Sequence, residues 1–223
     1  ALTIQSKAQT AGIIVKLASD KHGSIRSMAA QKMGEAVSAS FQKPLVKLAR
    51  DKDSEVRKKA YLSLRMYPAK ASVEALKIAL VDRQLLNQKV ACESLQILGT
   101  KMDISASLQA YIEHKDISRR RWSAKIFGIL NTKKFAPKIK AQLLRETDYN
   151  AQKEQLFALR QFKTLLNDAQ VKKLSVGHPF VKAELMYYLG VMDNQEFFHY
   201  IHDAAFMEKS NSVCHAALTA IGR

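Results

Sequence analysis

The sequence predicts an all-α fold, an α-solenoid built from about seven stacked helical hairpins. Two properties of the composition favour helices: the 223 residues include only 8 Gly and 4 Pro, and hydrophobic residues make up 47% of the chain. A loop-rich β-sandwich needs more turn residues, and a disordered chain has fewer hydrophobic ones. The third observation is a pattern that recurs at intervals of about 31 residues, which is typical of repeat architectures.

The clearest recurrence joins two segments at an offset of 31 residues, because residues 14–21 read IVKLASDK and residues 45–52 read LVKLARDK. Three markers follow nearly the same interval. Acidic residues occur at Asp20, Asp51, Asp82 and Glu113, loosely at Glu146, and again at Glu208 after a gap near Gly177. An apolar residue precedes glycine at Gly34, Gly99, Gly190 and Gly222. A β-branched residue opens the second half of the unit at Ile25, Val56, Val181 and Val213.

The second repeat indicates that each unit is a pair of helices. Pro44 suits the first turn of the first helix, where its missing N–H costs little. Ser54 is expected to cap the second helix, because its hydroxyl can accept a hydrogen bond from an unpaired N–H there. Val56, Ala60 and Leu64 recur at i, i+4 and i+8 and form one apolar stripe. A single hairpin cannot bury this stripe, so neighbouring hairpins must stack.

Seven units are predicted to start near residues 8, 42, 72, 104, 136, 168 and 194. The first two match the pattern best, whereas the third to fifth are degenerate and have Gln88 and Gln152 where an arginine is expected. No linker separates the units, so residues 1–223 are expected to form a single repeat domain, which could be part of a longer chain. The last helix has an apolar face that we expect a further repeat, a partner domain or a second copy to cover.

This pattern resembles HEAT repeats, in particular the short type of about 31 residues found in bilin-lyase-like HEAT proteins. The resemblance is carried by the Leu-x-x-Leu of the first helix, the aspartate in the turn, and the Val-Arg and Ala of the second helix, all present in residues 45–60. It implies a right-handed superhelix with a concave face lined by the second helices. It also implies a ladder of ion pairs between adjacent turns. The expected members of this ladder are Asp20, Asp51, Asp82, Arg26 and Arg57.

Positive charge is concentrated in one segment. The chain has 36 Lys and Arg against 20 Asp and Glu, a net charge of +16, and residues 115–140 hold nine basic residues and one acidic residue. A solvated face usually mixes both signs, so this segment is predicted to bind an anionic partner. Arg119, Arg120 and Arg121 would point about 100° apart on a helix, and one of them is expected to join the ladder. Trp122 is expected in the core rather than as a stacking platform.

These observations define a predicted partner-binding surface. Its residues are Lys58, Arg119, Arg120, Arg121, Lys125, Lys133 and Lys134. A second basic group, which consists of Lys58, Lys59 and Arg65 with Tyr61, is expected to extend this surface along the second helices. The predicted function is a non-catalytic interaction or scaffold module that binds an acidic protein partner on a basic concave surface.

No pattern in the sequence identifies a catalytic or metal centre. His199, His202 and Asp203 lie within one helical turn, but only His215 is available nearby as a further ligand, and surface histidines are the simpler interpretation. The two cysteines, Cys92 and Cys214, have no metal or redox spacing and are interpreted as small buried residues. We therefore predict no catalytic residue, no cofactor and no metal, and favour a protein that is not an enzyme.

Two alternatives to the scaffold stay open. The repeat number and the positive charge resemble those of alkylpurine DNA glycosylases, which implies nucleic-acid binding, although this chain lacks the several groove aromatic residues of that family. A bilin-lyase-like activity is implied by the repeat type alone. No apolar run approaches the roughly 20 residues of a membrane span. The cytoplasm is favoured as the compartment, while the start at Ala1 leaves a removed signal sequence open, and the oligomeric state is not predicted.

Overall fold

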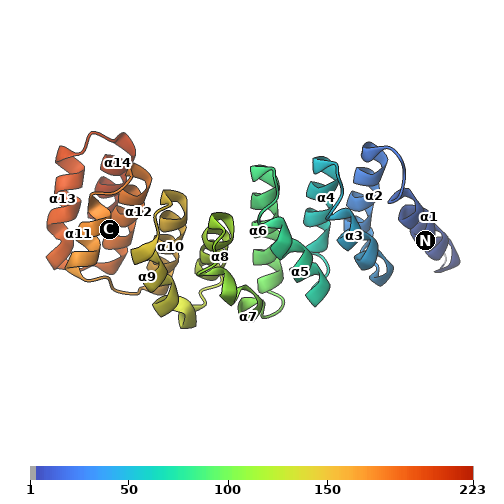
Figure 1. The fold of residues 1–223 in the computed structure, drawn as a ribbon, viewed down its shortest axis with the longest axis horizontal. Helices are drawn as coiled ribbons and strands as arrows, with labels where there is room; N and C mark the ends of the chain where they lie inside the picture. The colour runs from blue at the N-terminus through green and yellow to red at the C-terminus, as the bar shows by residue number, and fades with distance from the viewer. Residues whose placement is uncertain (1–3, 223) are drawn as a thin grey trace. The chain divides into compact units, whose positions relative to one another are not determined.

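The computed structural model describes residues 4–222, and the side chains of residues 9–222. Within that range the chain is helical and has no β-strand. Its helices are joined by short turns and form seven hairpins, each with a first and a second helix (Figure 1). The predicted all-α solenoid of about seven helical hairpins is therefore confirmed.

The chain divides into two compact units, Ala1–Ala106 and Ser107–Arg223. The boundary falls inside the short helix α7 (Ser105–Leu108), at the start of the fourth hairpin. The single uninterrupted domain expected from the sequence stays a prediction.

The first unit contains three hairpins. Their first helices are α1 (Ile4–Leu17), α3 (Gln42–Leu48), which follows the 3-10 turn η1 (Ala39–Phe41), and α5 (Lys70–Ala79). Their second helices are α2 (Gly23–Ala36), α4 (Ser54–Leu64) and α6 (Leu85–Gly99). Successive second helices pack against each other, α2 on α4 and α4 on α6. This stacking is what a single hairpin needs to bury its apolar stripe.

The second unit contains the other four hairpins. Their first helices are α7 with the 3-10 turn η2 (Gln109–Tyr111), α9 (Ala136–Arg145) after η3 (Lys133–Phe135), α11 (Asp168–Ser175), and α13 (Phe198–Met207) after η4 (Gln195–Phe197). Their second helices are α8 (Ile117–Ile129), α10 (Tyr149–Phe162), α12 (Pro179–Met192) and α14 (Asn211–Ile221). Here too each second helix packs against the next.

The second repeat folds largely as its sequence predicts. Val56, Ala60 and Leu64 are fully buried, so the apolar stripe of α4 forms part of the core. The capping residue differs from the expectation. Asp53, not Ser54, caps α4, because its carboxylate accepts a hydrogen bond from the backbone N–H of Glu55 at 2.8 Å. Ser54 is instead the first residue of the helix.

Glycines mark the places where second helices cross at short distance. A Cβ added to Gly128 on α8 would lie 2.9 Å from the Cα of Ala158 on α10. A Cβ on Gly190 of α12 would lie 2.7 Å from the Cβ of Ala220 on α14, and one on Gly34 would lie 2.4 Å from the hydroxyl of Ser63. Two of the apolar–glycine pairs in the sequence, at Gly34 and Gly190, therefore mark helix contacts in which no side chain fits.

Candidate partner-binding surface

Arginines at the fourth position of second helices form the predicted ladder. Arg26 of α2 donates from Nε to Asp51 at 2.7 Å, and Arg57 of α4 donates from Nε to Asp82 at 2.7 Å. Each guanidinium also donates to the turn of its own hairpin, as Arg26 does to the carbonyl of Asp20 at 2.9 Å. The ladder thus joins each hairpin of this unit to the next, and the expected pairs of Asp51 and Asp82 are confirmed.

Asp82 is the most heavily bonded carboxylate of the first unit. It accepts hydrogen bonds from Arg57, from the hydroxyl of Tyr61 at 2.8 Å and from the backbone N–H of Gln84 at 2.9 Å. Burial opposes ionisation, but these donors outweigh it and lower the pKa of Asp82 to about 2. Tyr61 is itself buried, so it is not part of an exposed basic group with Lys58 and Lys59 as the sequence led us to expect.

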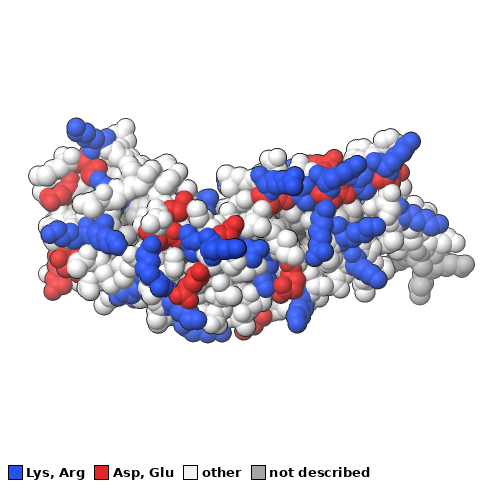
Figure 2. Space-filling view, in the orientation of Figure 1, with Lys and Arg blue, Asp and Glu red and all other residues white. Residues whose placement is uncertain are grey.

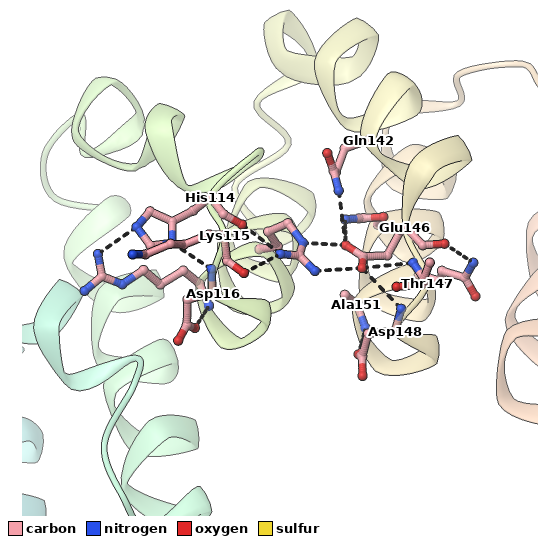
Figure 3. A network of polar contacts seen from close by, with 12 residues as sticks. His114, Lys115, Asp116, Gln142, Glu146, Thr147, Asp148 and Ala151 are labelled. Carbon is pink, nitrogen blue, oxygen red and sulfur yellow. Dashed lines mark hydrogen bonds and ion pairs between the residues drawn. The ribbon is translucent and has the colours of Figure 1, made fainter.

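Arg120 makes the corresponding pair in the second unit. It donates to Glu146 at 2.6 and 2.8 Å and to the carbonyl of His114 at 2.8 Å (Figure 3). Glu146 also accepts hydrogen bonds from Gln142, Gln155, Thr147 and Asp148. Burial opposes the charge of this carboxylate, yet the donors lower its pKa to about 2. Arg120 is therefore the ladder member among the three arginines, and all three nitrogens of its guanidinium already donate hydrogen bonds.

The acidic series read from the sequence is shifted in the fourth hairpin. The turn position there is occupied by His114, whose carbonyl accepts from Arg120, rather than by Glu113. Glu113 is exposed and pairs with Arg145 at 3.0 Å. Asp20, at the start of the series, contacts His22 at 3.1 Å. The turn residues Asp82, His114 and Glu146 follow one another at intervals of 32 residues, which is why an even spacing of 31 fails to find the turn position.

The degenerate repeats keep half of the ladder. Gln88 and Gln152 stand at the arginine position, and each donates to a turn carbonyl six residues earlier, at 2.7 and 2.8 Å. Cys214 does the same with its thiol at 3.1 Å. Lys182 instead pairs with Glu208 at 2.5 Å. The local bond within a hairpin therefore survives substitutions that remove the fork of the guanidinium.

The remaining predicted binding residues lie in separate places. Arg119 sits at the turn, with its guanidinium carbon 4.8 Å from the ring centre of Tyr111. Lys133 and Lys134 belong to η3, after the far end of α8, and are exposed. Lys58 is on α4 in the first unit and pairs with Glu55 at 2.6 Å. These residues therefore fall on different elements, and the predicted partner-binding surface stays a prediction.

Arg121 and Lys125 share one side of α8. The guanidinium carbon of Arg121 lies 4.4 Å from the ring centre of Trp122, and Nζ of Lys125 lies 5.7 Å from it. Trp122 is only 2% exposed, so it belongs to the core, as expected. Its ring makes cation–π contacts with the side chains of Arg121 and Lys125. Neither cation forms an ion pair with a carboxylate of the described residues.

Cations recur at the fifth position of four second helices, and the sequence predicted only two of them as binding residues. Lys58 and Arg121 were predicted, whereas the equivalent residues Lys89 of α6 and Lys153 of α10 were missed. Their spacing of 31 or 32 residues was the available signal. Basic and acidic side chains are both visible over the two units, which shows that positive charge is not confined to residues 115–140 (Figure 2).

A partly buried ion pair joins α10 and α12. Arg160 donates from Nε to Glu184 at 2.9 Å, and its guanidinium carbon lies 5.4 Å from the ring centre of Phe157 and 5.8 Å from that of Tyr187. Burial raises the pKa of Glu184, and the charge of Arg160 only partly offsets that effect. These two aromatic rings are thus engaged with an arginine of the protein itself.

The histidine cluster of the seventh hairpin forms no metal centre in the part of the chain that the structure describes, which contains no group of three or more His, Cys, Asp or Glu placed to hold a metal ion. His199 and His202 are exposed, and His202 contacts Asp203 at 3.4 Å. Cys92 is buried and Cys214 is half-buried. None of the helices from residue 4 to residue 222 is long and apolar enough to cross a membrane.

Comparisons with known proteins agree with this architecture. A family model described as HEAT repeats matches residues 10–96. The structure of the Escherichia coli protein YibA is similar with a TM-score of 0.55 and 14% identity, and the match covers 100% of this chain and 98% of that one. A chain from the structure of the complex of CpcE and CpcF of phycocyanin lyase from Nostoc sp. PCC7120 gives a TM-score of 0.49 and 15% identity. This match covers 99% of the present chain and 87% of the matched chain. Curated protein sequences give no significant match.

Proposed function

Because residues 10–96 of this chain are HEAT repeats and the later hairpins repeat the same fold, we propose that the protein is a non-catalytic interaction module that binds an acidic segment of a partner protein. The binding surface that we propose is made by Arg121, Lys125 and Lys153, and we call it the α8–α10 surface. These residues lie on two second helices that pack against each other.

The observation that carries this proposal is that the guanidinium of Arg121 forms no ion pair with a carboxylate of the described residues. Its Nε atom is buried and has no hydrogen-bond partner among the described residues. An arriving carboxylate could form charge-assisted hydrogen bonds with the accessible N–H groups of this guanidinium, each worth about 1.5–3 kcal/mol. Lys125 and Lys153 make no ion pair within the described chain and would add to the attraction.

An acidic protein segment fits this surface better than a nucleic acid does. Proteins that hold single-stranded nucleic acids combine cations with aromatic rings on which the bases stack. Trp122 is buried under Arg121 and offers no stacking face, and Phe157 and Tyr187 are half-buried rings that already lie close to Arg160. Asp116, the acidic residue nearest to Trp122 in the sequence, caps α8 by accepting from the N–H of Arg119 at 3.0 Å.

The test replaces Arg121 and Lys125 by glutamate and measures the binding of a labelled polyglutamate peptide by fluorescence anisotropy. We expect the affinity to fall by roughly tenfold or more, because each lost charge-assisted contact is worth about 1.5–3 kcal/mol. Lys133→Glu with Lys134→Glu is the matched control, since it changes the net charge by the same amount on exposed residues of the same unit. It should leave the affinity within about threefold.

Two results would contradict the proposal. One is an equal loss of affinity in both double variants, which would indicate a general effect of net charge. The other is tighter binding of a labelled oligonucleotide than of the peptide, with an affinity that falls steeply as salt is added, which would support the nucleic-acid alternative.

A further inference from the structure

The turns of the first unit carry a second, independent set of cations. Each of the three turns places a basic residue directly after the acidic turn residue, and α3 and its end add three more. These residues are Lys21, Lys52 and Arg83 in the turns and Lys43, Lys47 and Arg50 on and after α3. All six side chains are exposed. The repeated dipeptides at residues 20–21, 51–52 and 82–83 are their signal in the sequence.

The ladder leaves these cations without counter-ions. Asp51 and Asp82 turn toward Arg26 and Arg57 and are neutralised there, so they do not balance the basic residues beside them. None of the six exposed cations forms an ion pair with any carboxylate in the described part of the chain. The turn side of this unit is therefore positive even though acidic and basic residues alternate in its sequence.

Two hollows lie along this side of the unit. One, with a cavity volume of about 640 Å³, is lined by Lys43, Lys47 and Arg50 between the first and second hairpins. The other, of about 650 Å³, is lined by Lys52 and Arg83 between the second and third hairpins. Arg50 and Asp51 line both, so the hollows adjoin. We call the two together the turn groove.

Aliphatic side chains line part of each hollow. Val46 and Leu48 line the first hollow, and Ile78 and Val81 line the second. Tyr61 reaches the second hollow, but its hydroxyl donates to Asp82 and to the carbonyl of Ala49, and the residue is 2% exposed. Cations beside aliphatic side chains suit a peptide chain that carries both carboxylate and apolar side chains. Nucleic-acid bases would need an exposed ring, and a flat lipid surface would not enter a hollow.

The repeat spacing sets the register of the ligand. Packed helices lie about 8–10 Å apart, so equivalent turn cations recur at about that distance. A peptide in the extended polyproline II conformation advances about 3.1 Å per residue with about three residues per turn, so every third side chain lies on one face and meets the next cation. We propose that the turn groove binds an extended peptide segment that carries a carboxylate at about every third residue, with small apolar residues between. This site does not depend on the α8–α10 surface.

The experiment uses the full chain and a labelled peptide of five Glu-Val-Ser repeats. Binding is followed by fluorescence anisotropy, and the contact lysines are identified by zero-length crosslinking of carboxylates to lysine amines, followed by mass spectrometry. We expect crosslinks at Lys43, Lys47 and Lys52. Lys52→Glu with Arg83→Glu should weaken binding by roughly tenfold, since two attractive contacts become repulsive.

Several controls separate this site from general charge effects. Lys70→Glu with Lys101→Glu alters the same net charge at exposed residues near the other end of the third hairpin, and should leave the affinity within about twofold. Arg121→Glu with Lys125→Glu should leave the crosslinks in the turn groove unchanged, so a failure of the α8–α10 surface is told apart from a failure here. Circular dichroism checks that each variant is folded, and Lys43→Ala with Lys47→Ala tests the groove by removing charge without reversing it.

The proposal is overturned if the crosslinks fall only on lysines outside the turn groove, or if Lys52→Glu with Arg83→Glu binds as well as the unaltered protein. It is also overturned if an oligonucleotide or vesicles of anionic lipid bind to the turn groove more tightly than the peptide does.

Discussion

At the scale of single residues, three consecutive arginines take three different roles. Arg119 lies over the ring of Tyr111, Arg120 is bonded to Glu146, and Arg121 lies over Trp122. Successive side chains on a helix diverge by about 100°, so adjacent residues of one type meet different surroundings. Nε of Arg119 and Nε of Arg121 are both buried without a hydrogen-bond partner among the described residues, and Arg121 leads the proposed surface because it shares one side of α8 with Lys125.

The ladder carboxylates make stability depend on pH. The pKa of Asp82 is about 2 in the folded protein and near 3.9 in an unfolded chain, so its stabilising effect is complete above the unfolded value and is lost as the pH falls toward 2. We expect Asp82→Asn to lower the free energy of unfolding by about 2–4 kcal/mol at pH 7, because the buried Arg57 loses its counter-ion. Urea unfolding should show the difference shrinking between pH 5 and pH 2.

Asp53→Asn is the control for that measurement. Asp53 caps α4, and asparagine caps helices as well as aspartate does, so this change should have little effect at either pH. A constant difference between Asp82→Asn and the unaltered protein from pH 7 to pH 2 would contradict the account of Asp82.

At the scale of helices, small residues decide how closely neighbours pack. We expect Gly128→Ala and Gly190→Ala to destabilise the fold by about 1–3 kcal/mol, because the added methyl meets the backbone of α10 or α14. The alanine would otherwise favour a helix by about 1 kcal/mol. Thermal or urea unfolding measures the change.

Gly12 provides the matched comparison for the helix crossings. It also lies in a helix, but an added Cβ would meet nothing within 4 Å. Gly12→Ala should therefore be neutral or stabilise by up to about 1 kcal/mol. Stabilisation by all three substitutions would show that the crossings have room for a methyl group.

At the scale of the whole molecule, contacts run mainly between neighbouring hairpins within each unit. Stability in such arrays is close to a sum of local terms, so damage should stay near its origin. We expect Arg57→Met to accelerate amide hydrogen exchange in α2, α4 and α6 by roughly tenfold or more, with a much smaller effect on α12 and α14. Arg120→Met should act mainly on α8 and α10. An equal loss of protection throughout the chain would contradict this localised behaviour.

The sequence by itself determined the all-α class, the repeat length, the number of hairpins and two ladder pairs of the first unit. These properties are periodic, and the same residue pattern recurs in several repeats, so they can be recognised even where one repeat is degenerate. The burial of Trp122 was also expected from the sequence. Asp53 as the cap and His114 as the turn residue were missed, because capping and register depend on a shift of one residue that the spacing does not resolve.

Only the tertiary structure decided which charges are used within the protein and which are left for a partner. Arg120 and Arg121 look alike in the sequence, yet the carboxylate that separates their roles lies 26 residues from Arg120 and reaches it only when hairpins stack. The same stacking turns Asp51 and Asp82 toward arginines and leaves Lys52 and Arg83 unbalanced beside the turn groove. Composition counts every charge equally, whereas an ion pair forms only where the fold brings two groups within a few ångströms, and burial then fixes its strength.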